Sequence, residues 1–150
     1  MISQTVLVAL EAFEGDLDAA RGAAAVGRGL CVGEAMLEVD LCPLDGIGDA
    51  HAHEPSAIAT RLAELDFDTR MRAARAVVVG AGRLDEATLL GSATFEVATR
   101  ARQAGVPAYA VTAVNALSPF DARILDLQVV LQARDVRGLR RAGEQLAEIV

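Results

Sequence analysis

Residues 75–85 read Arg-Ala-Val-Val-Val-Gly-Ala-Gly-Arg-Leu-Asp, and this stretch decides the fold. Its first half, Arg75–Val79, is short and apolar beyond the first residue, which is typical of a strand buried in a parallel sheet. Its second half, Gly80–Asp85, is rich in glycine and predicts a loop that leads out of the strand. We therefore expect a buried parallel strand within an α/β domain.

On both sides of this stretch, predicted strands and helices alternate. Further strands are expected at Thr5–Ala9, Leu37–Cys42, Ala108–Thr112 and Leu127–Leu131. Helices are predicted over Leu17–Leu30 with Gly33 just past its end, Ser56–Leu65 with Ser56 as its N-cap, Asp68–Ala74, Ser92–Ala104, Ser118–Leu125 and Val136–Val150. This alternation indicates a three-layer α/β/α domain around a five-stranded, mainly parallel sheet of the Rossmann or flavodoxin-like type.

The composition narrows the class of protein. The 150 residues fit a single domain, and a content of 53% hydrophobic residues excludes a disordered chain. The net charge is −7 and every basic residue is arginine, so we expect neither nucleic acid nor an anionic membrane as a partner. The N-terminus lacks the features of a signal peptide, and Cys31 and Cys42 are expected to be small buried residues in a reducing, cytoplasmic compartment.

In parallel α/β folds, ligands bind where strands end and helices begin. The segments expected at this edge are Glu11–Gly15, Asp45–Asp49, Gly80–Asp85 and Thr112–Asn115. Gly80 and Gly82 would let a phosphate approach the backbone, and Arg83 could clamp it. The alternative is a strand-to-helix turn that needs glycine for its own conformation.

Acidic residues also gather in these segments, namely Glu11, Glu14, Asp45, Asp49 and Asp85. Clustered carboxylates can hold Mg²⁺ for phosphoryl transfer or act as a general base. They can equally be solvated loop residues, and without a metal they would repel a phosphate.

Residues 49–54 read Asp-Ala-His-Ala-His-Glu. In an extended loop, His51 and His53 would point the same way and could share a metal ion with Asp49. The alternative is an exposed polar loop. Ser92 and Thr94, near the start of a predicted helix, are expected to cap it and not to act as nucleophiles.

Together these segments resemble the bacterial glycerate kinases. Residues 5–15 (TVLVALEAFEG) are similar to the family's opening strand, which runs into Ala-Pro-Asp-Ser-Phe-Lys-Gly, and residues 45–50 (DGIGDA) stand where the family has Asp-Gly-Gly-Glu-Gly-Thr. The string Gly80–Asp85 with Thr88, Gly91 and residues 105–107 (GVP) follows the family's Gly-Glu-Gly-Arg-Leu-Asp, Thr-x-x-Gly-Lys and Gly-Val-Pro. The similar stretches cover nearly the whole chain in the family's order.

The chain departs from the family in length and in charge. The kinases carry a second domain inserted in the first, so the resemblance implies one glycerate-kinase-like domain over residues 1–150, with Asp45–Pro55 as the loop that replaces the insertion. Six motif positions differ: Glu11 stands for Asp, Ala12 for Ser, Glu14 for Lys, Ala81 for Glu, Ser92 for Lys and Glu96 for Gly.

The resemblance implies ATP-dependent phosphorylation of glycerate, an organic acid, with ATP and Mg²⁺ as cofactors. It assigns catalytic roles to Asp45, Arg83 and Asp85, and ligand-binding roles to Gly80, Gly82, Arg83, Thr88, Gly91, Glu11 and Gly15. The lost charges favour a catalytically degraded domain that binds a small anion or nucleotide or acts as an interaction module. The alternatives are an active glycerate kinase, and a metal-dependent enzyme that uses His51, His53, Asp45 and Asp49.

A homodimer is also expected. An apolar chain of this size that has lost a docked domain would expose surface, and self-association is the simplest way to cover it. The sequence places this surface near Asp45–Pro55 and the helices on either side of it.

Overall fold

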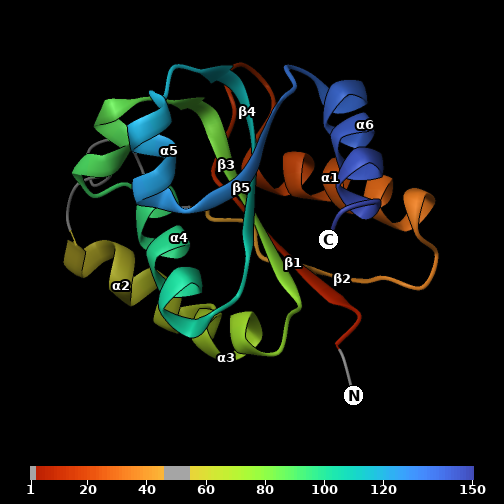
Figure 1. Ribbon diagram of the computed structural model, residues 1–150, viewed down its shortest axis with the longest axis horizontal. Helices are drawn as coiled ribbons and strands as arrows, with labels where there is room; N and C mark the ends of the chain where they lie inside the picture. Colours follow the sequence, from red (N-terminus) through yellow and green to blue (C-terminus); the bar gives the residue numbers. More distant parts are fainter. Residues whose placement is uncertain (1–2, 46–54) are drawn as a thin grey trace.

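A computed structural model describes residues 3–45 and 55–150. Its sheet has five strands, which are β1 (Thr5–Leu10), β2 (Glu38–Leu41), β3 (Ala76–Leu84), β4 (Ala108–Asn115) and β5 (Leu127–Gln132). The strands lie in the order β2-β1-β3-β4-β5, and each pairs parallel with its neighbours (Figure 1). This is the flavodoxin-like order, so the predicted three-layer α/β/α fold is confirmed.

Helices cover both faces of the sheet (Figure 1). One face carries α1 (Ala19–Gly33) and α6 (Val136–Ala147), which pack against each other. The other carries α2 (Pro55–Glu64), α3 (Phe67–Arg72), α4 (Ala93–Ala104), α5 (Pro119–Leu125) and the short 3₁₀ helix η2 (Glu86–Leu90). None of the helices found in residues 3–45 and 55–150 is long and apolar enough to cross a membrane.

The strands feed two separate hydrophobic cores, because successive side chains point to opposite faces of the sheet. Val6 and Val8 of β1 face α1 and α6, whereas Leu7 and Ala9 face α2, α3 and α4. All four are fully buried. A central strand that is apolar on both faces is what the uninterrupted apolar runs of the sequence predict.

The prediction that Gly80–Asp85 forms a loop is wrong, because β3 continues to Leu84. The neighbouring strand β4 also runs further than expected, to Asn115, so Arg83 and Leu84 pair with Val114 and Asn115. The added hydrogen bonds between the two strands outweigh the low strand propensity of glycine. Gly80 is needed there, because a Cβ on it would lie 1.9 Å from the carbonyl oxygen of Val111.

Several smaller expectations also change. Helix α1 runs through Gly33 and is capped by Glu34, and α2 begins before Ser56, which therefore is not its N-cap. Cys31 is exposed on α1, whereas Cys42 is buried as predicted. Burial raises the pKa of the Cys42 thiol, which keeps it protonated near neutral pH.

Candidate functional site

A hollow of about 180 Å³ opens where β1 and β3 end. It is lined by Glu11, Ala81, Arg83, Leu84, Asp85, Ala87, Thr88 and Ser92. Four of the site residues named from the sequence, Glu11, Arg83, Asp85 and Thr88, are therefore brought together. The hollow lies at the edge that the order of strands and helices predicts for a ligand.

Asp85 organises one side of this hollow. Its Oδ1 accepts a hydrogen bond from the N–H of Ala87 at 2.9 Å, and its own N–H donates to Oγ1 of Thr88 at 3.0 Å. These reciprocal bonds are a capping box that starts η2. Nε of Arg83 donates to Oδ2 at 2.8 Å, and this pairing holds the pKa of the Asp85 carboxyl below its usual value.

Glu11 organises the other side. Its Oε2 accepts hydrogen bonds from the backbone N–H of Thr94, at 3.1 Å, and from the Thr94 hydroxyl. Thr94 is fully buried in the first turn of α4, and Ser92 caps the same helix by accepting from the N–H of Phe95 at 3.0 Å. The carboxylate of Glu11 therefore occupies the N-terminus of α4, where N–H groups and the helix dipole favour an anion.

The charges of the hollow oppose a free phosphate. Two carboxylates, Glu11 and Asp85, line it together with one guanidinium, that of Arg83, which is already paired with Asp85. At a separation of about 4 Å and an effective dielectric of about 20, a pair of unit charges interacts by about 4 kcal/mol. The net negative charge thus disfavours a triphosphate unless a cation accompanies it.

The glycines assigned to ligand binding also have structural reasons to be glycine. Gly80 lets β4 approach β3, as described above. Gly91 ends η2 with a φ of +105°, a left-handed conformation that side chains rarely adopt. Gly82 lies against the backbone of Phe13 and Glu14, and Gly15 lies in the turn that follows β1.

Asp45 lies at the same edge but does not line the hollow. It follows Leu44, whose N–H donates to the carbonyl of Leu10 at 2.9 Å, and its own carbonyl accepts from Nε of Arg61 at 3.0 Å. Its side chain is exposed to solvent. The structure therefore holds the Asp45 backbone in place and leaves the carboxylate in water.

The proposed metal ligands Asp49, His51 and His53 lie outside the described residues. Across residues 3–45 and 55–150, no group of three or more His, Cys, Asp or Glu side chains could hold a metal ion.

A second hollow, of about 340 Å³, lies between α3 and α4 and was not predicted from the sequence. There Arg100 pairs with Glu96 at 2.9 Å and with Asp68 at 3.1 Å. Glu96 and Arg100 are four residues apart on a predicted helix, and this spacing is the sequence signal from which their ion pair could have been predicted.

Comparison with known proteins adds a family and a fold. The sequence model of the glycerate kinase family matches residues 46–123, which is 78 of the 150 residues. A search of curated proteins finds no match. Among solved structures, the flavodiiron protein from Giardia intestinalis is similar with a TM-score of 0.55 and 13% sequence identity, over 98% of this chain and 36% of that chain. At this identity the likeness shows the fold alone.

Proposed function

This chain belongs to the glycerate kinase family, and from that premise we propose that it is a member that does not transfer phosphate and that acts as an interaction module. Its ligand edge is held closed by its own side chains. In the kinases that the chain resembles, the same edge is expected to meet ATP and glycerate.

The observation that carries this proposal is the position of the Glu11 carboxylate at the N-terminus of α4. A helix N-terminus is a ready anion site, and here a tethered carboxylate takes the place of a free anion. An incoming phosphate must displace Glu11 from Thr94 and then lie beside the displaced carboxylate. Both steps cost free energy, so binding at this edge is expected to be weak.

The motif positions support the same conclusion. Phosphoryl transfer depends on positive groups that stabilise the charge of the transferred phosphate. Where the family motifs have lysine, this chain has Glu14 and Ser92, and Ala81 replaces a glutamate. Arg83 remains, but Asp85 neutralises it at 2.8 Å.

The length of the segment Asp45–Pro55 fits a reduced member of the family. We infer that this segment replaces an inserted domain, since only 13 residues separate Leu41, the end of β2, from Pro55, the start of α2. A surface left by such a loss is suited to contact another protein. Elsewhere, η2 and α5 contact each other and expose the apolar side chains of Leu90, Phe120 and Ile124.

Ligand binding tests the proposal. Thermal unfolding is measured with Mg·ATP, glycerate, inorganic phosphate or Zn²⁺, where a ligand present at one hundred times its Kd adds about 2.7 kcal/mol of stability. The intact chain is expected to show no shift with millimolar Mg·ATP or glycerate. A clear shift with micromolar Mg·ATP would contradict the proposal, and a shift with Zn²⁺ would support the metal-enzyme alternative at His51 and His53.

A pair of variants makes the test specific to the carboxylate at α4. Glu11→Gln keeps a side-chain oxygen for the Thr94 N–H and removes the negative charge, so phosphate binding is expected to increase. Glu86→Gln removes the same charge from an exposed side chain that does not line the hollow, and it serves as the control. Equal phosphate binding by both variants would show that Glu11 does not close the site.

A further inference from the structure

Among the residues that the structure describes, the arginines of α1 and α6 form no ion pair with an acid. Each ion pair found there involves an arginine of another element, namely Arg61, Arg70, Arg83 or Arg100. The arginine side chains of α1 and α6 are all exposed, and we call them the basic strip: Arg21, Arg28, Arg137, Arg140 and Arg141. Arg21 donates a hydrogen bond to the carbonyl of Asp16 at 2.8 Å, which leaves its charge uncompensated.

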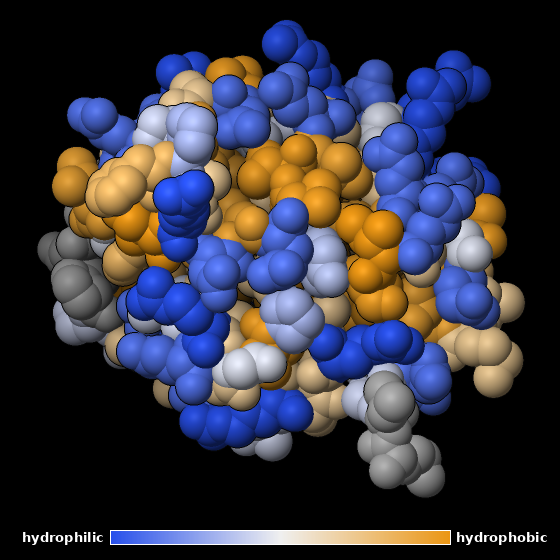
Figure 2. All heavy atoms as spheres, in the orientation of Figure 1, coloured by the Kyte–Doolittle hydropathy of each residue, from blue (hydrophilic) through white to orange (hydrophobic). Residues whose placement is uncertain are grey.

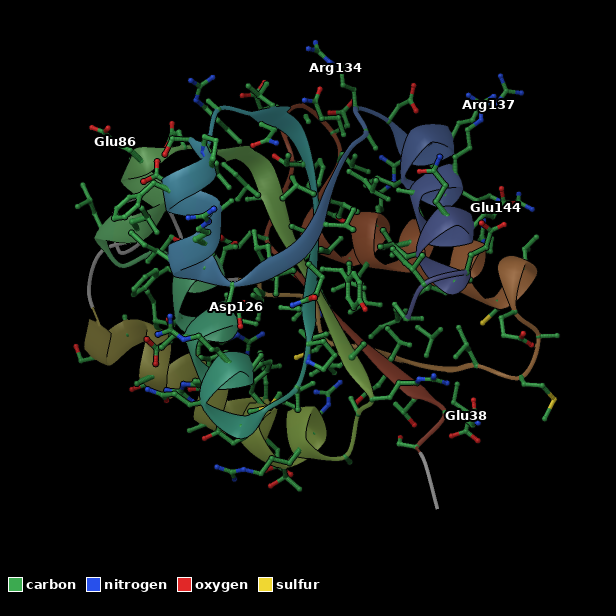
Figure 3. All side chains as sticks on the ribbon, viewed as in Figure 1. Glu38, Glu86, Asp126, Arg134, Arg137 and Glu144 are labelled. Atoms are coloured by element: carbon green, nitrogen blue, oxygen red, sulfur yellow. The ribbon has the colours of Figure 1, made fainter. Side chains whose placement is uncertain are left out.

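Two helices from opposite ends of the sequence bring the basic strip together. Helices α1 and α6 lie side by side on one face of the sheet (Figure 1), and their backbones are in direct contact at Gly29. Arg21 and Arg28 are about two turns apart on α1 and so share a side of that helix. Arg137 and Arg141, about one turn apart, do the same on α6. Figure 2 shows strongly hydrophilic side chains over α6, and Figure 3 shows Arg137 projecting away from it into solvent.

The charge of this surface is opposite to that of the rest of the chain. Helices α1 and α6 together hold five arginines and one acid, Glu144, so their net charge is +4. The whole chain has a net charge of −7, so the residues outside these two helices carry −11. The acids that flank the helices lie at their ends, at Asp18, Glu34, Asp135 and Glu148. The strip is therefore a basic surface bounded by acids.

The fold gains no stability from this concentration of positive charge. Like charges three or four residues apart on a helix repel, and Arg137 precedes Arg140 by three residues and Arg141 by four. Arg137 also lies in the first turn of α6, where the helix dipole disfavours a cation. Arrangements that oppose local stability are expected mainly at functional surfaces. An anion bound at the strip would remove the repulsion between its arginines.

We propose that the basic strip binds a short acidic segment of another protein, whose Asp and Glu carboxylates pair with the guanidinium groups. A guanidinium holds a carboxylate through two parallel hydrogen bonds, which fixes the orientation of the segment as well as its charge. The proposal names a partner for the interaction module and rests on the proposed function only to that extent. Peptide binding and phosphoryl transfer are measured separately, so either can fail alone.

The surroundings of the strip favour a short segment over a long polyanion. At physiological salt, exposed charges act over about 8 Å, so a ligand confined to the strip is little affected by the acids beyond it. Helix α6 has 12 residues and is about 18 Å long, so a peptide segment of similar length fits within the strip. A nucleic acid or an anionic membrane extends further, over the acids. Neither helix contains an aromatic residue on which a nucleic-acid base could stack.

Fluorescence anisotropy of a labelled polyglutamate peptide of 12 residues, the length of α6, tests the proposal with the intact chain. Binding is expected at about 50 mM salt and is expected to weaken about tenfold or more at about 200 mM, because salt screens the ion pairs. The double variant Arg137→Gln with Arg141→Gln is expected to weaken binding about tenfold or more at the lower salt. Glutamine is a good helix former, so α6 is expected to remain folded by circular dichroism.

A matched control shows whether the position of the charges matters. Arg72→Gln with Arg123→Gln removes the same charge from two exposed arginines on α3 and α5, and this variant is expected to bind the peptide as the wild type does. An equal loss in both double variants, or no binding by the wild type at the lower salt, would overturn the proposal.

Two further measurements test other occupants of the strip. Tighter binding of an RNA duplex or of phosphatidylserine vesicles than of the peptide would assign the strip to a different class of anion and would overturn the proposal. Light scattering of the wild type at the same salt is expected to show no self-association that depends on the strip. A dimer that Arg137→Gln with Arg141→Gln dissociates would assign the strip to a second copy of this chain, and it too would overturn the proposal.

Discussion

Asp85 shows how an acidic residue that resembles a catalytic group supports the fold. It accepts hydrogen bonds from Ala87 and Arg83, and its capping box with Thr88 starts η2. Removing a side-chain cap costs about 1 kcal/mol, within a range of roughly 0.5–2 kcal/mol. We expect Asp85→Ala to lose about this amount in urea unfolding at pH 7, and Asp85→Asn, which keeps an acceptor for the cap, to lose less.

The contribution of the Asp85 charge depends on pH in a defined direction. Arg83 lowers the pKa of Asp85 in the folded protein relative to its ordinary value of 3.8, so the charged form is stabilised by folding. This stability is present above the unfolded pKa and is lost as the pH falls through the folded one. The difference between wild type and Asp85→Asn should therefore shrink from pH 7 to pH 3; an equal difference at both pH values would show that the ion pair contributes nothing.

At the level of helices, the packing of α1 on α6 depends on glycine at the contact. A Cβ on Gly29 would lie 1.9 Å from the carbonyl oxygen of Arg140, and one on Gly143 would lie 2.2 Å from that of Val26. The helix backbones are thus in direct contact. Gly29→Ala must push the helices apart, and we expect it to cost about 3 kcal/mol, the upper end of the usual range for overpacking.

Gly22 in the same helix provides the matched control. A Cβ there would meet Leu10 and Leu139 at 3.7 Å, an ordinary contact. Gly22→Ala should therefore stabilise the protein by up to about 1 kcal/mol, through helix propensity alone. Thermal unfolding of the two variants tests this; a similar effect of both substitutions would contradict the close approach at Gly29.

The strands were predictable because their apolar runs are short and separated by helical segments. The extension of β3 through Gly80 and Arg83 was not, since it depends on pairing with Val111 and Val114, which are remote in the sequence. The start of α4 was predictable from Ser92, a typical N-cap. Local patterns therefore predicted element type and missed the boundaries that tertiary pairing sets.

For the molecule as a whole, the sequence predicted which residues lie at the ligand edge, but it did not predict which side chains they bind there. Glu11 and Thr94 are 83 residues apart, and no local pattern indicates that one caps the helix of the other. The pairing of Arg83 with Asp85 could have been predicted, since residues two apart in extended backbone share a face. The family resemblance identified Glu11, Arg83 and Asp85 as site residues. The structure shows that Glu11 binds the N-terminus of α4 and that Arg83 and Asp85 form an ion pair.

We propose that this member of the glycerate kinase family does not transfer phosphate. The most direct measurement is ADP release by the purified chain with Mg·ATP and glycerate, compared with the same reaction without glycerate. Because Glu11 fills the N-terminus of α4 and Asp85 neutralises Arg83, we expect no glycerate-dependent release. Turnover in the range of ordinary kinases, about 1–100 s⁻¹, would show instead that the chain is an active kinase.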